Sequence, residues 1–433
     1  MIVSRVPVPA AALIFLGALV AYLSNGHSIR SGDTAPTSLL PIAVLLDGSL
    51  RLDRFAAEEA RRWSSDAYFL VPTARGVVSF YPVATGLLAL PVYTLPVLLA
   101  ERRLGPTPAG WIDFAPNYEK LSAAILTALS VAACWGICGA LGFGVRLGLG
   151  LTALYAFGSE AFATSAQALW QHGPGCLAVI AAIGGFVALD RGRTSAAWLL
   201  SLCAGVAVAI RLNDVLLVAP LVLLALWRHP GRWPALVLPG AAIVLALAAY
   251  NQYYFGLPLG PYQAAADIFR WSAMPAGLAG TLFSPGRGLF VYFPAAAVAV
   301  GLLLGHPALL GERLVLGLVI GILATAALNA GFHAWWGGFC YGPRYFAESQ
   351  PAILLVLGIG LSRLSGPARR RLGILCFGLL LPYSVMVQAL GVYGHAVHDW
   401  NALPISVDEA QPRLWDVVDS PILRGLRGRP PGG

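Results

Sequence analysis

Long apolar runs dominate this sequence and restrict the classes of fold open to it. Of its 433 residues, 58% are hydrophobic and only 11% are charged, whereas a water-soluble protein carries about 25% charged residues. So few charges cannot cover a water-facing surface. Several runs are long enough to cross the roughly 30 Å hydrocarbon layer of a bilayer as helices. The sequence therefore predicts an all-α polytopic membrane protein, with residues 1–433 forming a single integral membrane domain.

The positive charge of the chain is a signal of membrane topology. The net charge of +8 comes almost entirely from arginine, with a single lysine at Lys120. In a membrane protein such an excess marks cytoplasmic loops, so we predict no nucleic-acid partner. Four basic clusters occupy predicted loops, at Arg146, at 191–193, at 228–232 and at 369–371.

The segment 81–100 decides on which side of the membrane these clusters lie. It is long enough to span, but Pro82, Pro91 and Pro96 interrupt it. If it crosses once, every basic cluster lies outside; if it does not cross, every cluster is cytoplasmic, as the positive-inside rule favours. We therefore predict that 81–100 is a re-entrant or interfacial hairpin.

The resulting topology has about eleven spanning helices, a cytoplasmic N-terminus and an external C-terminus. The stretch 196–227 lies between two basic loops and is predicted to be a hairpin. Its arms of about 13–15 residues reach only ~20 Å, so the turn from Arg211 to Asp214 should lie below the outer surface. The expected spans are 7–24, 120–141, 147–168, 176–189, the two arms of 196–227, 234–254, 294–305, 314–332, 350–362 and 372–391.

Four outer segments follow from this topology. The first outer loop is 25–119, and it contains a surface helix within 49–65, the hairpin at 81–100 and a loop around Trp111. A helix that is charged with spaced apolar residues, as 49–65 is, lies on a membrane surface. The other outer segments are 256–293, 333–348 and the tail 395–433.

Asp33 is the first candidate for chemistry. It is the first carboxylate of the chain and lies in a Gly-Asp-Thr turn just after the first apolar run. A carboxylate at the membrane surface can act as a general base or orient an attacking group. The alternative is a turn aspartate that caps the following helix.

Three arginines at the predicted outer boundary are candidate substrate-binding residues. A phosphate or diphosphate head needs cations in a partly desolvated site. Arg344 in Tyr-Gly-Pro-Arg-Tyr and Arg287 in Ser-Pro-Gly-Arg-Gly are held by turn residues, and Arg211 lies in the sunken turn. The alternative is pairing with Asp214 or Glu348, or extension of the side chain towards lipid head groups.

Histidine and tryptophan supply the remaining candidates. His172 could ligate a metal together with Asp33, and His333 and Trp336 could bind a substrate. The alternatives are a polar turn residue for His172 and an interfacial aromatic belt for the tryptophans.

Three stretches together resemble a known family. They are Gly-Asp-Thr followed by a surface helix, SFYPVATGLLALPVYTLP around Tyr81, and WWGGFCYGPRY around Arg344. The chain resembles the bacterial polyprenyl-phosphate-dependent glycosyltransferases of the GT-C superfamily, which includes protein mannosyltransferases and aminoarabinose transferases. Relatives often carry a basic residue beside the tyrosine-proline motif. Here Ser79 and Phe80 precede Tyr81, and the nearest basic residue is Arg75.

The resemblance implies a fold, an activity and a location. It implies a GT-C fold in a bacterial inner membrane, a polyprenyl-phosphate sugar donor, and a glycan, lipid or protein acceptor on the outer face. It gives Asp33 the role of general base or metal ligand, and it makes Tyr81 a substrate-binding candidate. The cofactor stays open, with a divalent metal as one candidate.

Two other functions stay open. A transporter or flippase of lipid-linked glycans would use the turn at Arg211 and Asp214 as a broken-helix site. A glycan polymerase or ligase would share the donor pocket of a sugar transferase. The absence of internal repeats and the large first outer loop favour the transferase over the transporter.

Overall fold

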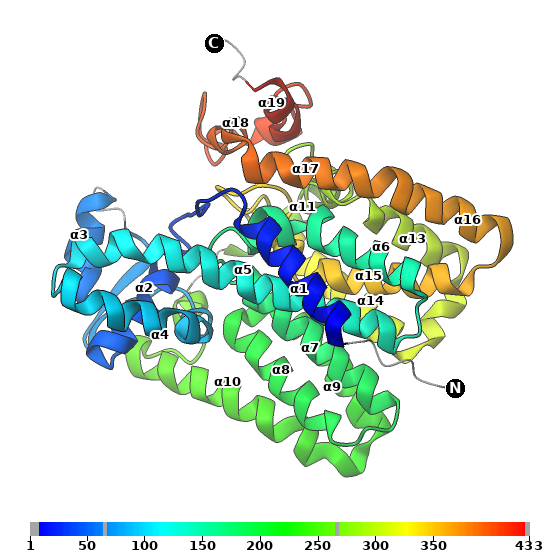
Figure 1. Cartoon of the computed structure of the whole chain (residues 1–433), viewed down its shortest axis with the longest axis horizontal. Coiled ribbons are helices and arrows are strands. Elements are labelled where there is room, and N and C mark those ends of the chain that lie inside the picture. The colour runs from blue at the N-terminus through cyan, green and yellow to red at the C-terminus, as the bar shows by residue number, and fades with distance from the viewer. Residues whose placement is uncertain (1–7, 64–66, 265–267, 429–433) are drawn as a thin grey trace.

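The computed structural model describes residues 8–63, 67–264 and 268–428, and nearly all of its regular structure is helical (Figure 1). Among these residues, six helices are long and apolar enough to cross a membrane, and six shorter apolar helices of 10–17 residues accompany them. The predicted class, an all-α polytopic membrane protein, is confirmed, while the number of spans stays a prediction. The six long helices are Ala84–Leu104, Pro108–Ala140, His172–Asp190, Pro230–Phe255, Arg313–Gly331 and Gly366–Tyr393.

The described elements follow one another in this order. The α-helices are α1 (Val8–Leu23), α2 (Ala35–Asp47), α3 (Asp53–Arg62), α4 (Ala84–Leu104), α5 (Pro108–Ala140), α6 (Val145–Gly158), α7 (His172–Asp190), α8 (Ala196–Ile210), α9 (Val215–Arg228), α10 (Trp233–Phe255), α11 (Met274–Phe283), α12 (Leu289–Tyr292), α13 (Ala295–Gly305), α14 (Arg313–Gly331), α15 (Ser349–Arg363), α16 (Gly366–Ile374), α17 (Leu381–Tyr393), α18 (His395–Asp399) and α19 (Pro421–Arg427). The strands are β1 (Leu70–Thr73) and β2 (Gly76–Ser79). Short 3-10 or π turns are η1 (Ala161–Ser165), η2 (Leu212–Asp214), η3 (Pro230–Arg232), η4 (Gly260–Ala264), η6 (Trp271–Ala273), η7 (Pro307–Gly311), η8 (Arg344–Phe346), η9 (Leu375–Leu380) and η10 (Gln411–Trp415).

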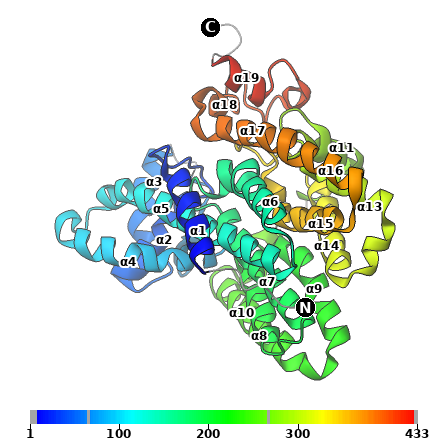
Figure 2. The same cartoon turned by 45° about the vertical axis from the view of Figure 1, so that its right-hand side comes forward.

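The helices gather into groups that both views separate clearly. Helices α2, α3 and α4 lie together with α5 at one side of the molecule, and α8 to α10 form a second group (Figure 1, Figure 2). Helices α13 to α16 form a third group, and α18 and α19 cap the end of α17 (Figure 2). Helices α1, α5, α6 and α7 lie between these groups and connect them.

The main core forms where small residues let helix backbones approach. A Cβ atom on Gly240 of α10 would lie 2.5 Å from the carbonyl oxygen of Ser201 in α8, so only glycine fits there. A Cβ on Gly185 of α7 would lie 2.7 Å from the backbone nitrogen of Leu200. Small residues at helix contacts are typical of membrane bundles, in which close backbone packing replaces the hydrophobic drive of a water-soluble core.

A second core corrects the prediction for 81–100. This segment does not form a hairpin: α4 is one continuous helix, with Pro91 and Pro96 inside it. Tyr93 and Val97 lie four residues apart on its buried face and pack in a core shared with α2 and α5. Each internal proline removes one backbone hydrogen bond, but the packing of the buried face through Tyr93 and Val97 stabilises the continuous helix. Whether α4 crosses the membrane stays a prediction.

The region before 120 differs from the predicted loop as well. Helix α5 begins at Pro108, and its first turns carry Trp111 and Glu119 on a buried face. The polar residues in this stretch suggested a loop, but they lie on the first turns of α5, one face of which is buried. Asp113 is one of them, and it forms an ion pair of 2.7 Å with Arg62 of α3.

The predicted surface helix within 49–65 is present as α3, with residues 64–66 outside the described part of the chain. Sequence patterns did not predict the antiparallel hairpin of β1 and β2 that follows. Asp53, the first residue of α3, accepts a hydrogen bond from the Val77 backbone nitrogen at 2.9 Å and so ties the helix to the hairpin.

Several predicted boundaries hold and others move. The stretch 196–227 is a helical hairpin, α8 and α9, with η2 at its turn, as predicted. The expected span 147–168 is shorter, because α6 ends at Gly158 and a π turn follows. The segments 256–293 and 395–433, which were predicted to be outer loops, contain helices of their own, among them α11, α18 and α19.

Candidate active site

Three segments that lie far apart in the sequence meet at Asp33. Its Oδ2 atom accepts a hydrogen bond of 2.7 Å from Nη1 of Arg344, a residue 311 positions later. Its Oδ1 atom accepts hydrogen bonds from the hydroxyl groups of Tyr81, at 2.5 Å, and Tyr68, at 3.0 Å. The three motifs that carried the sequence resemblance therefore converge on one carboxylate.

The Asp33 carboxylate does not cap the next helix. The residue preceding α2 is Thr34, and no side-chain hydrogen bond caps the helix start. Asp33 instead uses both oxygens for the arginine and the two tyrosines. The capping role considered from the sequence is therefore wrong.

A buried ion pair fixes the loop that carries Asp33. Arg30 lies 2.7 Å from Oε2 of Glu119, whose side chain is fully buried in α5. The backbone nitrogen of Ile29 also donates to the carbonyl oxygen of Gln167, at 3.1 Å. These contacts hold the first loop against the segment after η1, and this segment carries Trp170 into the site.

Arg344 is held in place by aromatic rings and a glycine. Its guanidinium carbon lies 5.0 Å from the ring centre of Trp170 and 5.4 Å from that of Tyr345. A Cβ on Gly337, which has a positive φ of 79°, would lie 3.0 Å from the Arg344 Nε atom. A cation stacked on aromatic faces keeps its charge in a partly desolvated place.

Its surroundings keep Asp33 charged. Burial alone would raise the pKa of Asp33, but the Arg344 charge and the hydrogen bonds from Tyr81, Arg344 and Tyr68 together hold it below the usual value. The side chain of Asp33 nevertheless remains 22% exposed and that of Arg344 12% exposed. The pair is therefore charged and partly reachable from outside.

A second acidic network lies next to the first. Glu348 accepts a hydrogen bond of 2.6 Å from Arg211 and lies 2.9 Å from Nδ1 of His172. Asp214 lies close by: a Cβ on Gly175 would be 3.1 Å from the nearer Glu348 oxygen and 3.3 Å from an Asp214 oxygen.

The two networks touch through the segment between η1 and α7. Trp170 stacks on Arg344, and its ring centre lies 6.3 Å from that of His172. The sequence analysis considered pairing of its arginines with Asp214 or Glu348; Arg211 does pair with Glu348, while Arg344 pairs with Asp33.

Arg287, Trp336 and His333 occupy other places. The buried Arg287 donates to the carbonyl oxygens of Trp336 and Gly286, at 3.0 and 2.8 Å, and to the Asn401 side chain, at 2.5 Å. Trp336 is buried and donates to Asp408 at 2.6 Å. Both residues join the loop after α14 to the C-terminal segment, and these contacts give no support to the predicted substrate contacts. His333 is exposed, and its ring packs on Phe332.

The predicted metal site receives no support from this geometry. His172 contacts Glu348 and Arg211, whereas Asp33 contacts Arg344 and two tyrosines. Among the residues that the structure describes, no group of three or more His, Cys, Asp or Glu side chains is placed to hold a metal ion. A divalent metal stays a prediction.

A small aromatic recess, with a volume of about 10 Å³, lies beside Tyr81. It lies between the 79–82 segment and α10, and Tyr250, Tyr262 and Leu212 contribute to its wall. The Phe80 and Tyr262 rings pack edge to face at 5.3 Å. Sequence patterns singled out neither this recess nor Tyr68 and Trp170, because no local motif marks a residue whose partners come from distant segments.

Comparisons with known proteins match the fold but not the sequence. No family model matches the chain, and no curated protein sequence matches it. Among solved structures, the chain is similar to ArnT from Cupriavidus metallidurans bound to undecaprenyl phosphate, with a TM-score of 0.50, 12% identity, and coverage of 98% of this chain and 76% of that one. It is equally similar to the apo state of the same protein, with a TM-score of 0.50, 14% identity and coverage of 97% and 75%. The chain therefore shares its overall fold with ArnT, in agreement with the fold that the sequence resemblance predicted.

Proposed function

We propose that this protein is a membrane glycosyltransferase that moves a sugar from a polyprenyl-phosphate carrier to a glycan, lipid or protein acceptor on the outer face of the membrane. The contact between Asp33 and Arg344 carries the proposal, with Tyr81 on the same carboxylate. An accessible carboxylate and an accessible guanidinium held side by side suit a reaction that has an acceptor proton and a phosphate leaving group.

Arg344 is the residue we assign to the donor phosphate. In the free protein its Nη1 atom donates to Asp33, and its Nε atom is buried without a hydrogen-bond partner in the described structure. A phosphate oxygen offers a stronger, doubly hydrogen-bonded partner than one carboxylate oxygen. Donor binding would therefore draw the guanidinium away from Asp33.

This exchange prepares Asp33 for catalysis. Apart from the opposing effect of burial, the Arg344 charge is the largest influence on the pKa of Asp33, and it lowers that pKa. Once the phosphate neutralises Arg344, the pKa of Asp33 rises and the carboxylate becomes a better base. Donor binding and activation of the acceptor are coupled in this way through one ion pair.

The transfer step needs no reactant beyond the donor, the acceptor and the Asp33 carboxylate. The acceptor hydroxyl oxygen forms a bond to the anomeric carbon of the sugar, and the bond from that carbon to the phosphate oxygen breaks. The polyprenyl phosphate leaves with the bonding electron pair and stays beside Arg344. The hydroxyl proton passes to Asp33, and Tyr81 and Tyr68 hold the carboxylate in place by their hydrogen bonds.

Two observations support a lipid-linked donor. Tyr250, Tyr262 and Leu212 form an aromatic and apolar surface next to Tyr81, although the recess between them has a volume of only about 10 Å³ in the free protein. The solved structure of ArnT, which has the same fold, contains undecaprenyl phosphate. A polyprenyl chain needs such a surface, and a sugar ring stacks on aromatic faces.

The proposal is tested by incubating the purified protein with a radiolabelled polyprenyl-phosphate sugar and a crude membrane fraction that contains acceptors. We expect the label to move to the acceptor and free polyprenyl phosphate to accumulate. A carrier or flippase would instead move the intact donor between leaflets of a vesicle, and a polymerase or ligase would act only on preassembled glycans. Donor that remains intact after incubation with the purified protein and the acceptor fraction would contradict a transferase.

A further inference from the structure

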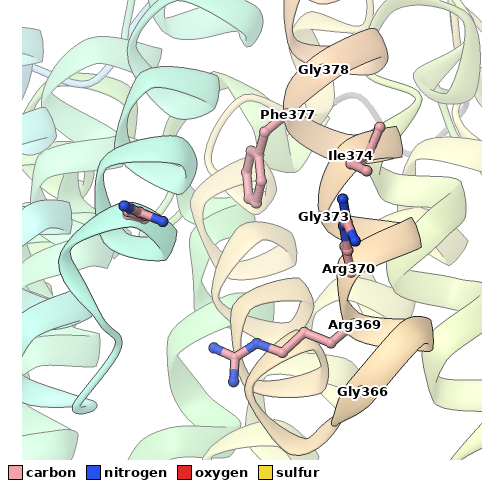
Figure 3. Close-up of a pocket in the computed structure, with 8 residues that line it drawn as sticks. Gly366, Arg369, Arg370, Gly373, Ile374, Phe377 and Gly378 are labelled. Atoms are coloured by element: carbon pink, nitrogen blue, oxygen red, sulfur yellow. The ribbon is translucent and has the colours of Figure 1, made fainter.

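A wide basic groove lies at the end of the molecule opposite Asp33. The segment from α16 to α17 runs over 28 residues, from Gly366 to Tyr393, which corresponds to about 42 Å of helix. Tyr393 bonds to Ser24, close to the loop that carries Asp33, so Gly366 lies at the far end. The groove has a volume of about 650 Å³ and is lined by Arg146, Gly366, Arg369, Arg370, Gly373, Ile374, Phe377 and Gly378 (Figure 3).

The arginines of this groove have no carboxylate partner among the described residues. Arg146 comes from α6, and Arg369 and Arg370 come from α16, so two separate segments bring positive charge to one space. The carboxylates at this end are already engaged: Asp190 pairs with Arg313, and Glu312 pairs with Arg363. Three guanidinium groups that repel one another and face a common groove are stabilised when an anion occupies it.

Both helices turn their positive ends towards this groove. Helix α6 begins at Val145 and α16 at Gly366, and neither has an acidic residue in its first turn or a side-chain cap. The first turn of a helix presents unpaired backbone N–H groups and the positive end of the helix dipole. An arginine in that turn adds to the same charge, so the electrostatic preference for an anion becomes stronger.

The wall of the groove changes from charged to apolar along the helix. Ile374, Phe377 and Gly378 follow the arginines and continue into the apolar part of the chain (Figure 3). Phe377 packs against α6, where a Cβ on Gly150 would lie 2.8 Å from its ring. Gly373 leaves the middle of the groove open, because a Cβ there would meet nothing within 4 Å. A groove with a cationic end and an apolar end fits an amphiphile better than a free anion.

We propose that this groove binds an anionic glycerophospholipid. The head-group phosphate would lie among Arg146, Arg369 and Arg370, and an acyl chain would run along Ile374 and Phe377. The site is separate from Asp33, because the length of the bundle lies between them. We assign it to the binding of a membrane lipid and not to sugar transfer. The lipid site can therefore be tested independently of the proposed function.

Native mass spectrometry of the detergent-solubilised full chain tests the site, with phosphatidylglycerol and phosphatidylcholine titrated separately. We expect the wild type to bind phosphatidylglycerol more tightly than phosphatidylcholine. A basic residue near an anionic lipid is worth about fivefold in affinity, so the triple variant R146Q/R369Q/R370Q should bind phosphatidylglycerol roughly 100-fold more weakly. The matched control is R191Q/R193Q/R232Q, which removes three exposed arginines outside the groove and should leave binding within about twofold of the wild type.

A second variant separates the groove from general charge. Gly373→Trp fills the open middle without changing any charge, and it should also weaken phosphatidylglycerol binding while leaving the melting temperature near that of the wild type. Equal weakening by the control triple variant would contradict a specific groove. Equal competition by inorganic phosphate would contradict a lipid ligand, and tighter binding of polyprenyl phosphate would contradict a glycerophospholipid.

Discussion

Two carboxylates near the segment from Trp170 to His172 have similar partners but different surroundings. Asp33 and Glu348 each lie within 2.7 Å of an arginine nitrogen. The Asp33 side chain is 22% exposed, whereas that of Glu348 is 2% exposed. The two arginines are almost equally exposed, at 12% for Arg344 and 11% for Arg211, so it is the carboxylate that is reachable at one position and buried at the other.

The partners of the two carboxylates sharpen this contrast. Glu348 is surrounded by Arg211, His172 and the neighbouring Asp214, which all come from helix ends of the bundle. Asp33 lies on a loop, and two of its three partners are tyrosine hydroxyl groups. A buried network of charges holds helix ends together, whereas a partly exposed one can exchange a partner for a ligand. From this difference we infer a structural role for Glu348, and it agrees with the chemical role proposed for Asp33.

The largest expected effect is on the turnover of an Asp33→Asn variant. Asparagine keeps the size of the side chain and an oxygen that can accept from Tyr81, but it cannot act as a base. Base catalysis is typically worth 10²–10⁴-fold, so sugar transfer should fall by about that factor. The melting temperature should change little, because a partly exposed ion pair contributes only about 1 kcal/mol or less.

The matched control for this variant is Asp47→Asn. Asp47 is also a carboxylate of the first loop region that pairs with an arginine, Arg54, but it lies outside the Asp33 cluster. Transfer activity and melting temperature are measured on the same preparation of each variant. Full transfer activity in Asp33→Asn would return Asp33 to the role of a structural turn residue.

For Glu348→Ala we expect the opposite pattern, a loss of stability with donor binding retained. Removing this side chain leaves Arg211 buried beside His172 without its closest anion. Breaking a buried ion pair costs roughly 3–5 kcal/mol, so the variant should melt at a clearly lower temperature. The fraction that remains folded should still bind the donor. A Glu348→Ala variant with unchanged stability and no donor binding would place Glu348 in the substrate site and remove the contrast with Asp33.

The sequence predicted what local composition controls. Apolar runs and the scarcity of charge were enough for the membrane class, and the basic loops around 196–227 were enough for the helical hairpin and its turn at Arg211. The motifs around Asp33, Tyr81 and Arg344 pointed to three positions that the fold does bring together. Each of these inferences depends on residues close to one another in the chain.

The errors came from features that only tertiary packing decides. Pro91 and Pro96 predicted an interrupted segment, but the buried stripe through Tyr93 keeps α4 continuous. The turn residues around Arg287 suggested a substrate site; its guanidinium contacts Asn401, 114 residues later, and a substrate role for Arg287 stays a prediction. Tyr68 and Trp170 had no signal at all, because their only distinction is contact with distant segments.

The smallest expected effect is a change in stability with pH, and it distinguishes the two carboxylates once more. Surrounding charges and hydrogen bonds outweigh burial and lower the pKa of Asp33 below its ordinary value, and the same holds for Glu348, beside Arg211 and His172. A carboxylate with a lowered pKa stabilises the fold at pH values above its ordinary pKa of about 4, and this contribution is lost as the pH falls through the folded-state pKa.

The difference in melting temperature between the wild type and Asp33→Asn should therefore be constant from pH 5 to pH 8 and shrink below about pH 4. The difference for Glu348→Gln should be larger at neutral pH and shrink over the same acidic range. Thermal melts of the three proteins in one detergent across this range measure both differences. A difference for Asp33→Asn that grows towards low pH would mean that Asp33 is protonated in the folded protein, and Arg344 would then not hold it as an anion.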